Sequence, residues 1–175
     1  MISVLLIDGR SGSGKTTLAE RVAAELDAQI LHVEDLYPGW DGLAEGSAAV
    51  AEALQHGLHR RYDWLAEEFS EPRIELDPSR PLIVEGCGAL TFANLDAAKR
   101  WAERSGLPGG VRCVWLRLEE GERRRRALAR DGQVFAPHWD RWAEQERAFF
   151  GEHLPWLLAD EMLEGGESGE GGAGG

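Results

Sequence analysis

Short apolar runs alternate along this chain with longer segments in which apolar residues recur at helical spacing. The apolar runs, which predict strands, cover residues 2–7, 29–33, 81–85 and 111–116, and residues 159–163 could form a last short strand. Helical spacing begins at Leu18, Val22, Ala23 and Leu26, and further helices are predicted over 44–58, 92–105, 119–130 and around 139–149. Strands that alternate with helices are typical of a parallel sheet covered by helices. We therefore predict an α/β protein with three α/β/α layers and a five-stranded parallel sheet.

A glycine-rich segment links the first predicted strand to the first helix. Residues 9–16 read Gly-Arg-Ser-Gly-Ser-Gly-Lys-Thr, and they match the phosphate-binding pattern G-x-x-x-x-G-K-[ST] at every fixed position. In such a loop backbone N–H groups surround the phosphates, Lys15 reaches the β- and γ-phosphates, and the Thr16 hydroxyl ligates Mg²⁺. An ordinary glycine-rich turn is the alternative. The pattern predicts a P-loop NTPase fold with a nucleotide site formed by Gly9, Ser11, Gly12, Ser13, Gly14, Lys15, Thr16 and Thr17.

Acidic residues close two of the predicted strands, at the sheet edge where ligands of open α/β sheets bind. Asp35 follows the second strand and is predicted to be the general base that takes a proton from an acceptor hydroxyl. A turn or helix cap is the alternative for Asp35, and Glu34 and Asp41 are the next candidates for the base. Glu85 closes the third strand and is predicted to hold Mg²⁺ together with Thr16.

Basic residues concentrate in one predicted helix, at residues 123–126 and 130. Positive charge over the transferred group favours phosphoryl transfer, so Arg126 and Arg130 are predicted to contact phosphate. Solvated arginines paired with neighbouring glutamates are the alternative for Arg124 and Arg125. Because the segment after Arg130 contains helix breakers, we predict a lid at about residues 123–138.

Composition limits the partners and the compartment. The chain has 175 residues, which fits one domain, predicted here over residues 1–163. Its net charge of −12, from 19 basic and 31 acidic residues, argues against a nucleic-acid partner. No apolar run is long enough to span a membrane, and two cysteines in apolar stretches favour reduced thiols and a cytoplasmic location. Residues 164–175 are nearly all Gly, Glu and Ser, and this tail is predicted to be disordered.

Several motifs together resemble the uridine kinase and phosphoribulokinase-like branch of P-loop small-molecule kinases. The matching segments are the phosphate loop at 9–16, Glu-Asp-Leu-Tyr at 34–37, Arg-Tyr-Asp-Trp at 61–64, Leu-Ile-Val-Glu-Gly at 82–86, the arginine-rich helix that closes on Arg130 and Asp131, and Ala-Asp at 159–160. The resemblance implies that Asp35 is the base for a sugar hydroxyl. It also implies that Tyr62 lines the acceptor pocket and that lid arginines at Arg126 and Arg130 clamp the phosphates.

The acceptor half departs from that family. Glu67 stands where uridine kinases carry a histidine, the family's Asp-His-Pro element is missing, and residues 131–138 contain no arginine. The segment from Tyr37 to Leu43 occupies the corresponding part of the chain. An aromatic face at Trp40 in this segment, or at Trp64, could stack on a base or sugar. The residues predicted to bind the acceptor are Asp35, Tyr37, Trp40, Asp41, Tyr62 and Glu67.

These observations predict an ATP- and Mg²⁺-dependent kinase that phosphorylates a hydroxyl of a small molecule such as a nucleoside. Two alternatives stay open at this point. One is a P-loop NTPase that hydrolyses ATP or GTP without a small acceptor, and the other is a non-catalytic nucleotide-binding regulatory module. The sequence leaves open the identity of the acceptor and the oligomeric state, for which a homo-oligomer is one option.

Overall fold

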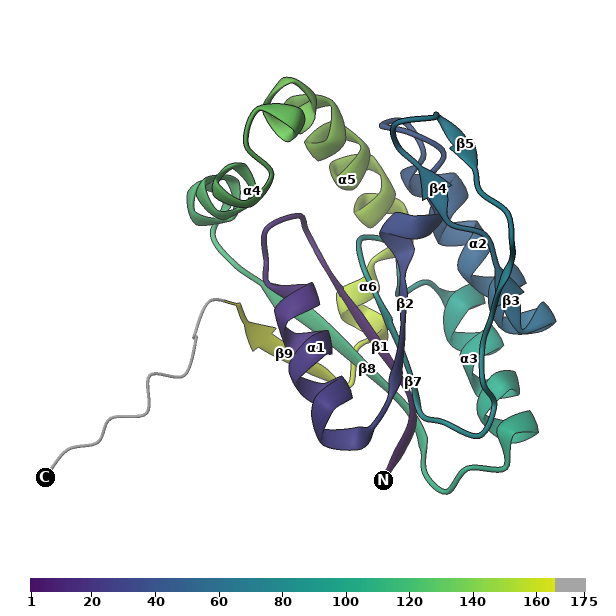
Figure 1. Cartoon of the computed structure of the whole chain (residues 1–175). Coiled ribbons are helices and arrows are strands. Elements are labelled where there is room, and N and C mark those ends of the chain that lie inside the picture. Colours follow the sequence, from purple (N-terminus) through teal and green to yellow (C-terminus); the bar gives the residue numbers. More distant parts are fainter. Residues whose placement is uncertain (166–175) are drawn as a thin grey trace, which may run out of the picture.

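A five-stranded parallel sheet forms the centre of the protein in the computed structural model, which describes residues 1–165. Its strands, in the order in which they lie side by side, are β2 (Gln29–His32), β7 (Leu82–Glu85), β1 (Ile2–Gly9), β8 (Gly110–Arg117) and β9 (Glu161–Glu164) (Figure 1). The predicted α/β class and the five parallel strands are confirmed. β9 runs through Glu164, and beyond Gly165 the predicted tail lies outside the described residues.

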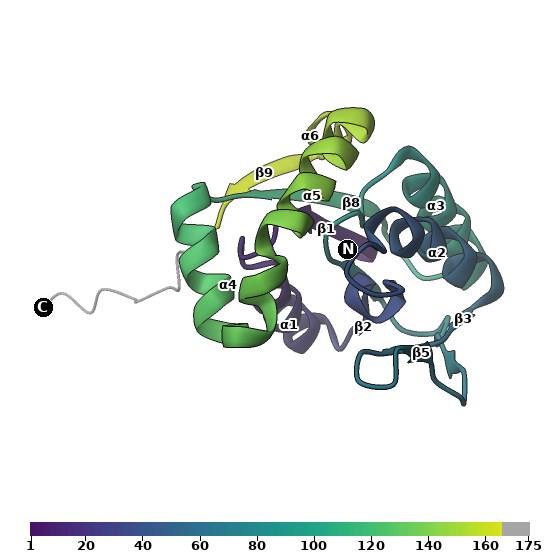
Figure 2. The same cartoon turned by 90° about the horizontal axis from the view of Figure 1, so that it is seen from above.

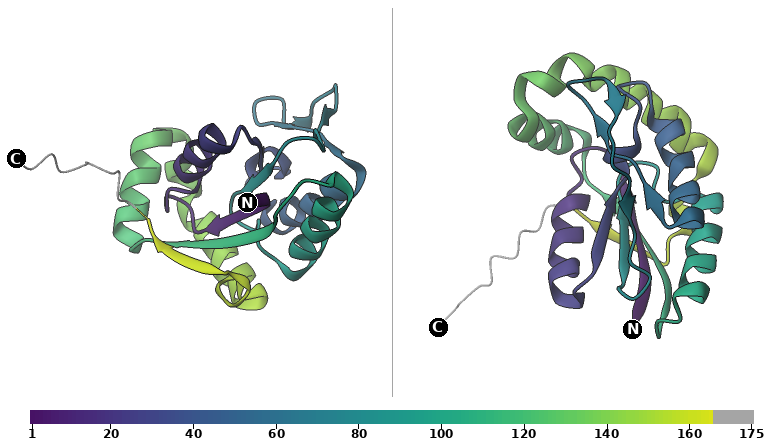
Figure 3. Two further views of the ribbon diagram at one scale, coloured as in Figure 1. Left: turned by 90° about the horizontal axis from the view of Figure 1, so that it is seen from below. Right: turned by 45° about the vertical axis from the view of Figure 1, so that its right-hand side comes forward.

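Helices cover both faces of the sheet because side chains alternate along each strand. From β1, Leu5 and Ile7 pack toward α1 (Lys15–Leu26). Val4 and Leu6 join the larger core, which lies under α2 (Leu43–His56) and α3 (Phe92–Ser105). The right panel of Figure 3 shows α1 on one side of the sheet and these two helices on the other. This is the predicted three-layer arrangement.

An arch of helices passes over the carboxyl ends of the strands. It consists of α4 (Glu120–Phe135), the short 3₁₀ helix η2 (Ala136–His138) and α5 (Trp139–His153), and α6 (Pro155–Leu158) then leads back to the sheet (Figures 1 and 2). The sequence predicts that the helix ends at residue 130 and that breakers follow. The helical backbone of α4 is indeed interrupted at Gly132, whose φ of 53° and ψ of −131° are readily adopted only by glycine. A second helical segment, which the sequence does not predict, then continues to Phe135.

A short β-arm that the sequence pattern does not predict lies between α2 and β7. Its strands are β3 (Leu58–His59), β4 (Tyr62–Asp63), β5 (Glu68–Phe69) and β6 (Ile74–Glu75), and they pair as β3 with β6 and β4 with β5. Each strand has only two residues, which is too short for a periodic signal. The 3₁₀ helix η1 (Val33–Leu36) leads out of β2 toward this arm. Among the described residues, no helix combines the length and the apolar character that crossing a membrane requires.

The phosphate loop and α4 approach each other at Gly12, and this contact can be tested. Gly12 has a φ of +80°, and a Cβ added there would lie 2.8 Å from the carbonyl carbon of Arg123. We expect Gly12→Ala to lower the free energy of unfolding by about 1–3 kcal/mol, because strain and a backbone clash add together. Gly151→Ala is the matched control, since a Cβ there meets open space on α5. Chemical denaturation should show a gain of about 0.5–1 kcal/mol for this control. Equal stability of Gly12→Ala and the wild type would contradict the described contact.

Candidate functional site

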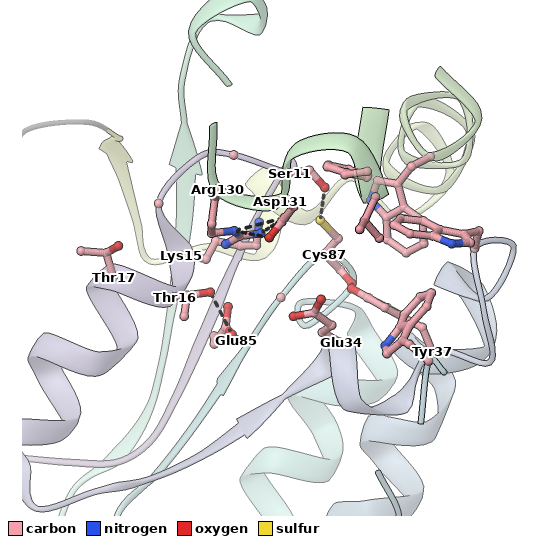
Figure 4. Close-up of a pocket in the computed structure, with 18 residues that line it drawn as sticks. Ser11, Lys15, Thr16, Thr17, Glu34, Tyr37, Glu85, Cys87, Arg130 and Asp131 are labelled. Atoms are coloured by element: carbon pink, nitrogen blue, oxygen red, sulfur yellow. Dashed lines mark hydrogen bonds and ion pairs between the residues drawn. The ribbon is translucent and has the colours of Figure 1, made fainter. Parts of the chain in front are cut away.

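A cavity of about 430 Å³ lies at the carboxyl ends of the strands, beneath the arch. The phosphate loop forms one end of it and aromatic side chains form the other (Figure 4). The residues that line the cavity are Ser11, Gly12, Gly14, Lys15, Thr16, Thr17, Glu34, Tyr37, Trp40, Trp64, Glu85, Gly86, Cys87, Arg130, Asp131, Val134, Phe135 and Trp142. Of the predicted nucleotide-binding residues, only Gly9 and Ser13 are outside this lining.

The phosphate loop has the local structure that an anion site needs. Gly12 and Gly14 adopt left-handed backbone conformations, with φ of 80° and 97°. Gly14 is also the N-cap of α1, and within residues 1–165 no side chain caps that helix end. The N–H groups of the first turn of α1 and the positive end of its dipole are therefore available to a phosphate.

Lys15 is held in place among acidic neighbours. Its side chain is buried, and its Nζ donates to the carbonyl oxygen of Arg10 at 3.0 Å. Burial by itself would lower the pKa of Lys15, but Cys87, Glu85 and other nearby groups outweigh burial and raise it. Lys15 therefore presents a permanent positive charge beside the cavity.

Thr16 and Glu85, the predicted metal ligands, lie side by side. Thr16 Oγ1 donates to Glu85 Oε1 at 3.2 Å, and His32 Nδ1 lies 2.6 Å from the same oxygen. The hydrogen bond between His32 and Glu85 raises the pKa of His32. Within the described residues, no group of three or more His, Cys, Asp or Glu side chains could hold a metal ion. A hydroxyl and a carboxylate beside a phosphate loop nevertheless fit Mg²⁺, which takes one or two protein oxygens and completes its shell with water and phosphate.

The neighbouring carboxylates of Glu34 and Asp35 point to different surroundings. Successive residues of a 3₁₀ helix point about 120° apart, so neighbours in η1 face different surroundings. Asp35 Oδ1 lies 3.2 Å from Arg61 Nε, and Asp35 is not among the residues that line the cavity. Glu34 lines it, between Glu85 and Tyr37 in Figure 4. Burial raises the pKa of Glu34, although the charge of Arg130 opposes the shift.

The arch contributes one cationic side chain to the cavity. Arg130 lines it and pairs with the neighbouring Asp131, with distances of 3.1 Å from Nε and 2.9 Å from NH2 to Oδ2. Arg126, the other arginine predicted to clamp phosphate, is not part of the lining, and its Nε donates to Glu122 at 2.8 Å. Arg123 is buried and donates to the carbonyl oxygen of Ser11 at 3.3 Å, so it connects α4 to the phosphate loop.

The predicted acceptor residues divide into two groups. Tyr37 and Trp40 line the cavity. Asp41, Tyr62 and Glu67 do not: Asp41 forms an ion pair with Arg141, Tyr62 packs against other rings of the arm, and Glu67 is exposed. The arm instead brings Trp64 to the cavity, and the arch brings Phe135 and Trp142.

Two buried carboxylates around the phosphate loop have no role in the predictions from sequence. Glu146 of α5 accepts from the backbone N–H of Ser11 at 2.9 Å, and Cys87 Sγ lies 3.6 Å from the same carboxylate oxygen. Asp8 accepts from the backbone N–H groups of Gly9, Gly88 and Leu90, at 2.7, 3.1 and 2.9 Å. Each could have been noticed in the sequence as a charged residue at an apolar position. Glu146 interrupts the apolar face of its helix, and Asp8 ends an apolar strand. Both join the phosphate loop to the elements around it.

Asp8 provides a test of this scaffold. An asparagine in its place presents an NH₂ group to at least one of the three backbone donors, so a buried N–H loses its acceptor. We expect Asp8→Asn to lower the free energy of unfolding by about 1–3 kcal/mol. Asp140→Asn, an exposed position on α5, should leave it within about 0.5 kcal/mol. Chemical denaturation of both variants makes the comparison, and equal effects would show that the backbone donors do not depend on Asp8.

Comparison with known proteins shows the fold. The sequence matches no protein-family model and no curated protein. Among solved structures, shikimate kinase from Acinetobacter baumannii in complex with shikimate is similar with a TM-score of 0.55 and 15% identity, covering 95% of this chain and 86% of that chain. Shikimate kinase from Bacteroides thetaiotaomicron is similar with a TM-score of 0.53 and 13% identity, covering 94% and 88%. A gluconokinase from Sinorhizobium meliloti 1021 gives 0.50 and 20%, covering 94% and 83%.

The fold is therefore the P-loop NTPase fold that the sequence predicts, and it matches the form found in shikimate kinases. These similar structures leave the uridine kinase-like branch unconfirmed, since they act on a different kind of acceptor. At such identities the likeness defines the fold, and function has to be argued from the site.

Proposed function

We propose that this protein is an ATP-dependent kinase that transfers the γ-phosphoryl group to a hydroxyl of a small molecule. One observation carries the proposal: a single cavity has a phosphate loop at one end, a compartment for an organic molecule at the other, and the carboxylate of Glu34 between them. A hydrolase needs only room for water beside the phosphate. The fold shared with shikimate kinases and a gluconokinase is consistent with a kinase.

In the proposed reaction the phosphate loop and Lys15 bind the β- and γ-phosphates and neutralise their charge. The acceptor hydroxyl attacks the γ-phosphorus while its proton passes to Glu34. A new oxygen–phosphorus bond forms to the acceptor, the bond between the γ-phosphorus and the bridging oxygen breaks, and ADP leaves with that electron pair. Thr16 and Glu85 would hold Mg²⁺, which supplies further neutralisation of the phosphates when bound.

Arg130 and the kink at Gly132 support a lid in the arch. The guanidinium group lines the same cavity as Lys15 and is paired there with Asp131. Gly132 lies two residues further on, where the backbone already departs from the helix. We propose that residues of about 123–138 close over the nucleotide and exclude water, which favours transfer to the acceptor over hydrolysis. Two buried free cysteines, Cys87 and Cys113, support a reducing, cytoplasmic setting for this reaction.

Glu85 offers a test of the metal assignment. Glu85→Gln keeps the size of the side chain and the hydrogen bond from Thr16 but removes the charge. We expect turnover to fall much more than ATP affinity, because the change disturbs metal placement more than phosphate contacts. Titration of activity with Mg²⁺ should shift to higher concentration in the variant. If the titrations of variant and wild type overlay, Glu85 is structural.

A screen for acceptor-dependent ADP release tests the function as a whole. Nucleosides, sugars, sugar acids and amino alcohols are offered with ATP and Mg²⁺, and ADP is measured with and without each compound. Stimulation by an acceptor supports the kinase. Equal release without any acceptor indicates a hydrolase, and nucleotide binding without release indicates a regulatory module.

A further inference from the structure

Five aromatic side chains form the end of the cavity that lies away from the phosphate loop. We call them the aromatic box, and they are Tyr37, Trp40, Trp64, Phe135 and Trp142. They come from four separate parts of the chain: the segment after η1, the β-arm, the end of α4 and the helix α5. Residues so far apart in sequence meet only in the folded protein, so the box is a product of the tertiary structure.

Contacts between the rings hold the box in shape. The rings of Tyr37 and Trp142 meet edge to face with centroids 4.8 Å apart, and the Tyr37 hydroxyl donates to the carbonyl oxygen of Cys87 at 2.6 Å. Trp40 packs against Trp64 at 5.0 Å and stacks on Phe135 at 5.4 Å. Such contacts fix the rings before any ligand binds, which reduces the entropy lost on binding.

The ionisable groups that line the cavity are mostly acidic. Three carboxylates, Glu34, Glu85 and Asp131, face two cations, Lys15 and Arg130. Lys15 belongs to the phosphate loop, and Arg130 is paired with Asp131. Neither cation lies within the aromatic box.

Two arginines near the acceptor end are engaged at the surface. Arg61 pairs with Asp35, and Arg141 pairs with Asp41. Neither arginine lines the cavity. His138 stacks on the Trp40 ring with centroids 4.3 Å apart but is not part of the lining either. Among the described residues, the lysine and arginine side chains of the lining are therefore Lys15 and Arg130, each already engaged, and a carboxylate or phosphate among the rings of the box would be costly in a partly dehydrated site.

A positive charge on the acceptor fits these surroundings in two ways. The faces of tryptophan and tyrosine rings attract an ammonium group, and cages of several rings are the usual binding site for such groups. In addition, if Arg130 turns to the transferred phosphate, the carboxylate of Asp131 loses its ion-pair partner while it still lines the cavity. An ammonium group on the acceptor, close to Asp131, would then compensate the negative charge of that carboxylate.

We propose that the acceptor is an amino alcohol whose ammonium group sits in the aromatic box, and that the box rejects acceptors with a carboxylate or phosphate. This inference rests on the proposed kinase function, because only a kinase has an acceptor. The preference of the cavity for a positively charged ligand can be measured without turnover. It also separates this protein by its acceptor chemistry from kinases that take acids such as shikimate or gluconate.

A series of three probes of similar size tests the charge preference on the wild-type protein. The probes are choline, dimethylbutanol in which carbon replaces the quaternary nitrogen, and hydroxybutyrate, which carries a carboxylate. Calorimetric titration in the presence of ADP should show choline binding at least about tenfold tighter than dimethylbutanol, a typical gain for a partly dehydrated cation–π site. Hydroxybutyrate should bind weakest. Equal binding of choline and dimethylbutanol, or tightest binding of hydroxybutyrate, would overturn the proposal.

Trp64→Leu tests whether the box is the place where the charge preference arises. Trp64 lies on the β-arm and is only partly buried, so its loss should leave the core intact. The advantage of choline over dimethylbutanol should fall several-fold in this variant. Trp156→Leu, which removes a partly buried tryptophan of α6 outside the cavity lining, is the control and should keep the advantage. An unchanged advantage in Trp64→Leu, or an equal loss in both variants, would place the preference elsewhere.

The two proposals fail in different ways. If choline binds in the box but neither choline nor any other hydroxyl compound stimulates ADP release, the kinase proposal fails and the binding preference stands. If ADP release is stimulated only by acids or sugar acids, the kinase proposal stands and the aromatic box has been misassigned.

Discussion

Replacing Lys15 with alanine is expected to reduce turnover at least about 10²–10³-fold, because it removes a fixed positive charge from the transferred phosphates. ATP affinity should fall as well, since the same charge binds the ground state. Lys99 is the only other lysine in the sequence and is exposed on α3, so Lys99→Ala is the matched control and should behave like the wild type. Steady-state kinetics and calorimetric titration with ATP give both quantities.

The fold of the Lys15 variant must be checked in the same experiment. Lys15 is buried among Asp8, Glu85 and Glu146, and its removal leaves these carboxylates with less compensation. Thermal unfolding followed by circular dichroism should show a lower melting temperature but a cooperative transition. Wild-type turnover by a folded Lys15→Ala protein would contradict the phosphate-loop assignment.

Glu34→Gln is expected to lower kcat about 10²–10⁴-fold, the usual contribution of a positioned general base. The amide keeps the shape and most of the hydrogen bonding but cannot take the proton. ATP affinity should stay close to wild type, because the phosphate loop binds the donor. Asp35→Asn, one residue along η1, is the control, and it should change kcat little because Asp35 does not line the cavity.

The pH profile gives an independent check on the base. Burial raises the pKa of Glu34, so the base is lost to protonation at a higher pH than for an ordinary glutamate. The acidic decline of wild-type activity should therefore begin at a higher pH than an ordinary glutamate base would give. A large loss of kcat in Asp35→Asn together with wild-type activity in Glu34→Gln would return the role of base to Asp35.

The main features of the fold could be predicted because each has a local signal in the sequence. Apolar stretches mark four of the five strands of the sheet, and the fifth, β9, carries the weaker signal of Met162 and Leu163 between acidic residues. The phosphate loop follows from fixed glycines and a lysine that no other common turn requires. The contact of Thr16 with Glu85 also follows, because parallel strands deliver their carboxyl ends to the same edge of the sheet.

Features that depend on orientation or on distant packing could not be predicted. Glu34 and Asp35 are adjacent carboxylates, and only the turn of η1 decides which of them faces the cavity. The helical segment that resumes after Gly132 carries Phe135, whose ring packs against Trp40 and Trp139, and the sequence does not show this packing. No periodicity in the sequence records these tertiary contacts.

A kinase of this kind must leave the γ-phosphoryl group on a hydroxyl of a small molecule. The most direct test follows labelled γ-phosphate from ATP in the presence and absence of candidate acceptors, and separates phosphate esters from inorganic phosphate. We expect label in an ester only when an acceptor is present, and we expect Glu34→Gln to suppress this transfer while ATP still binds. Release of all label as inorganic phosphate, at the same rate with and without every acceptor, would show that the protein is not a kinase.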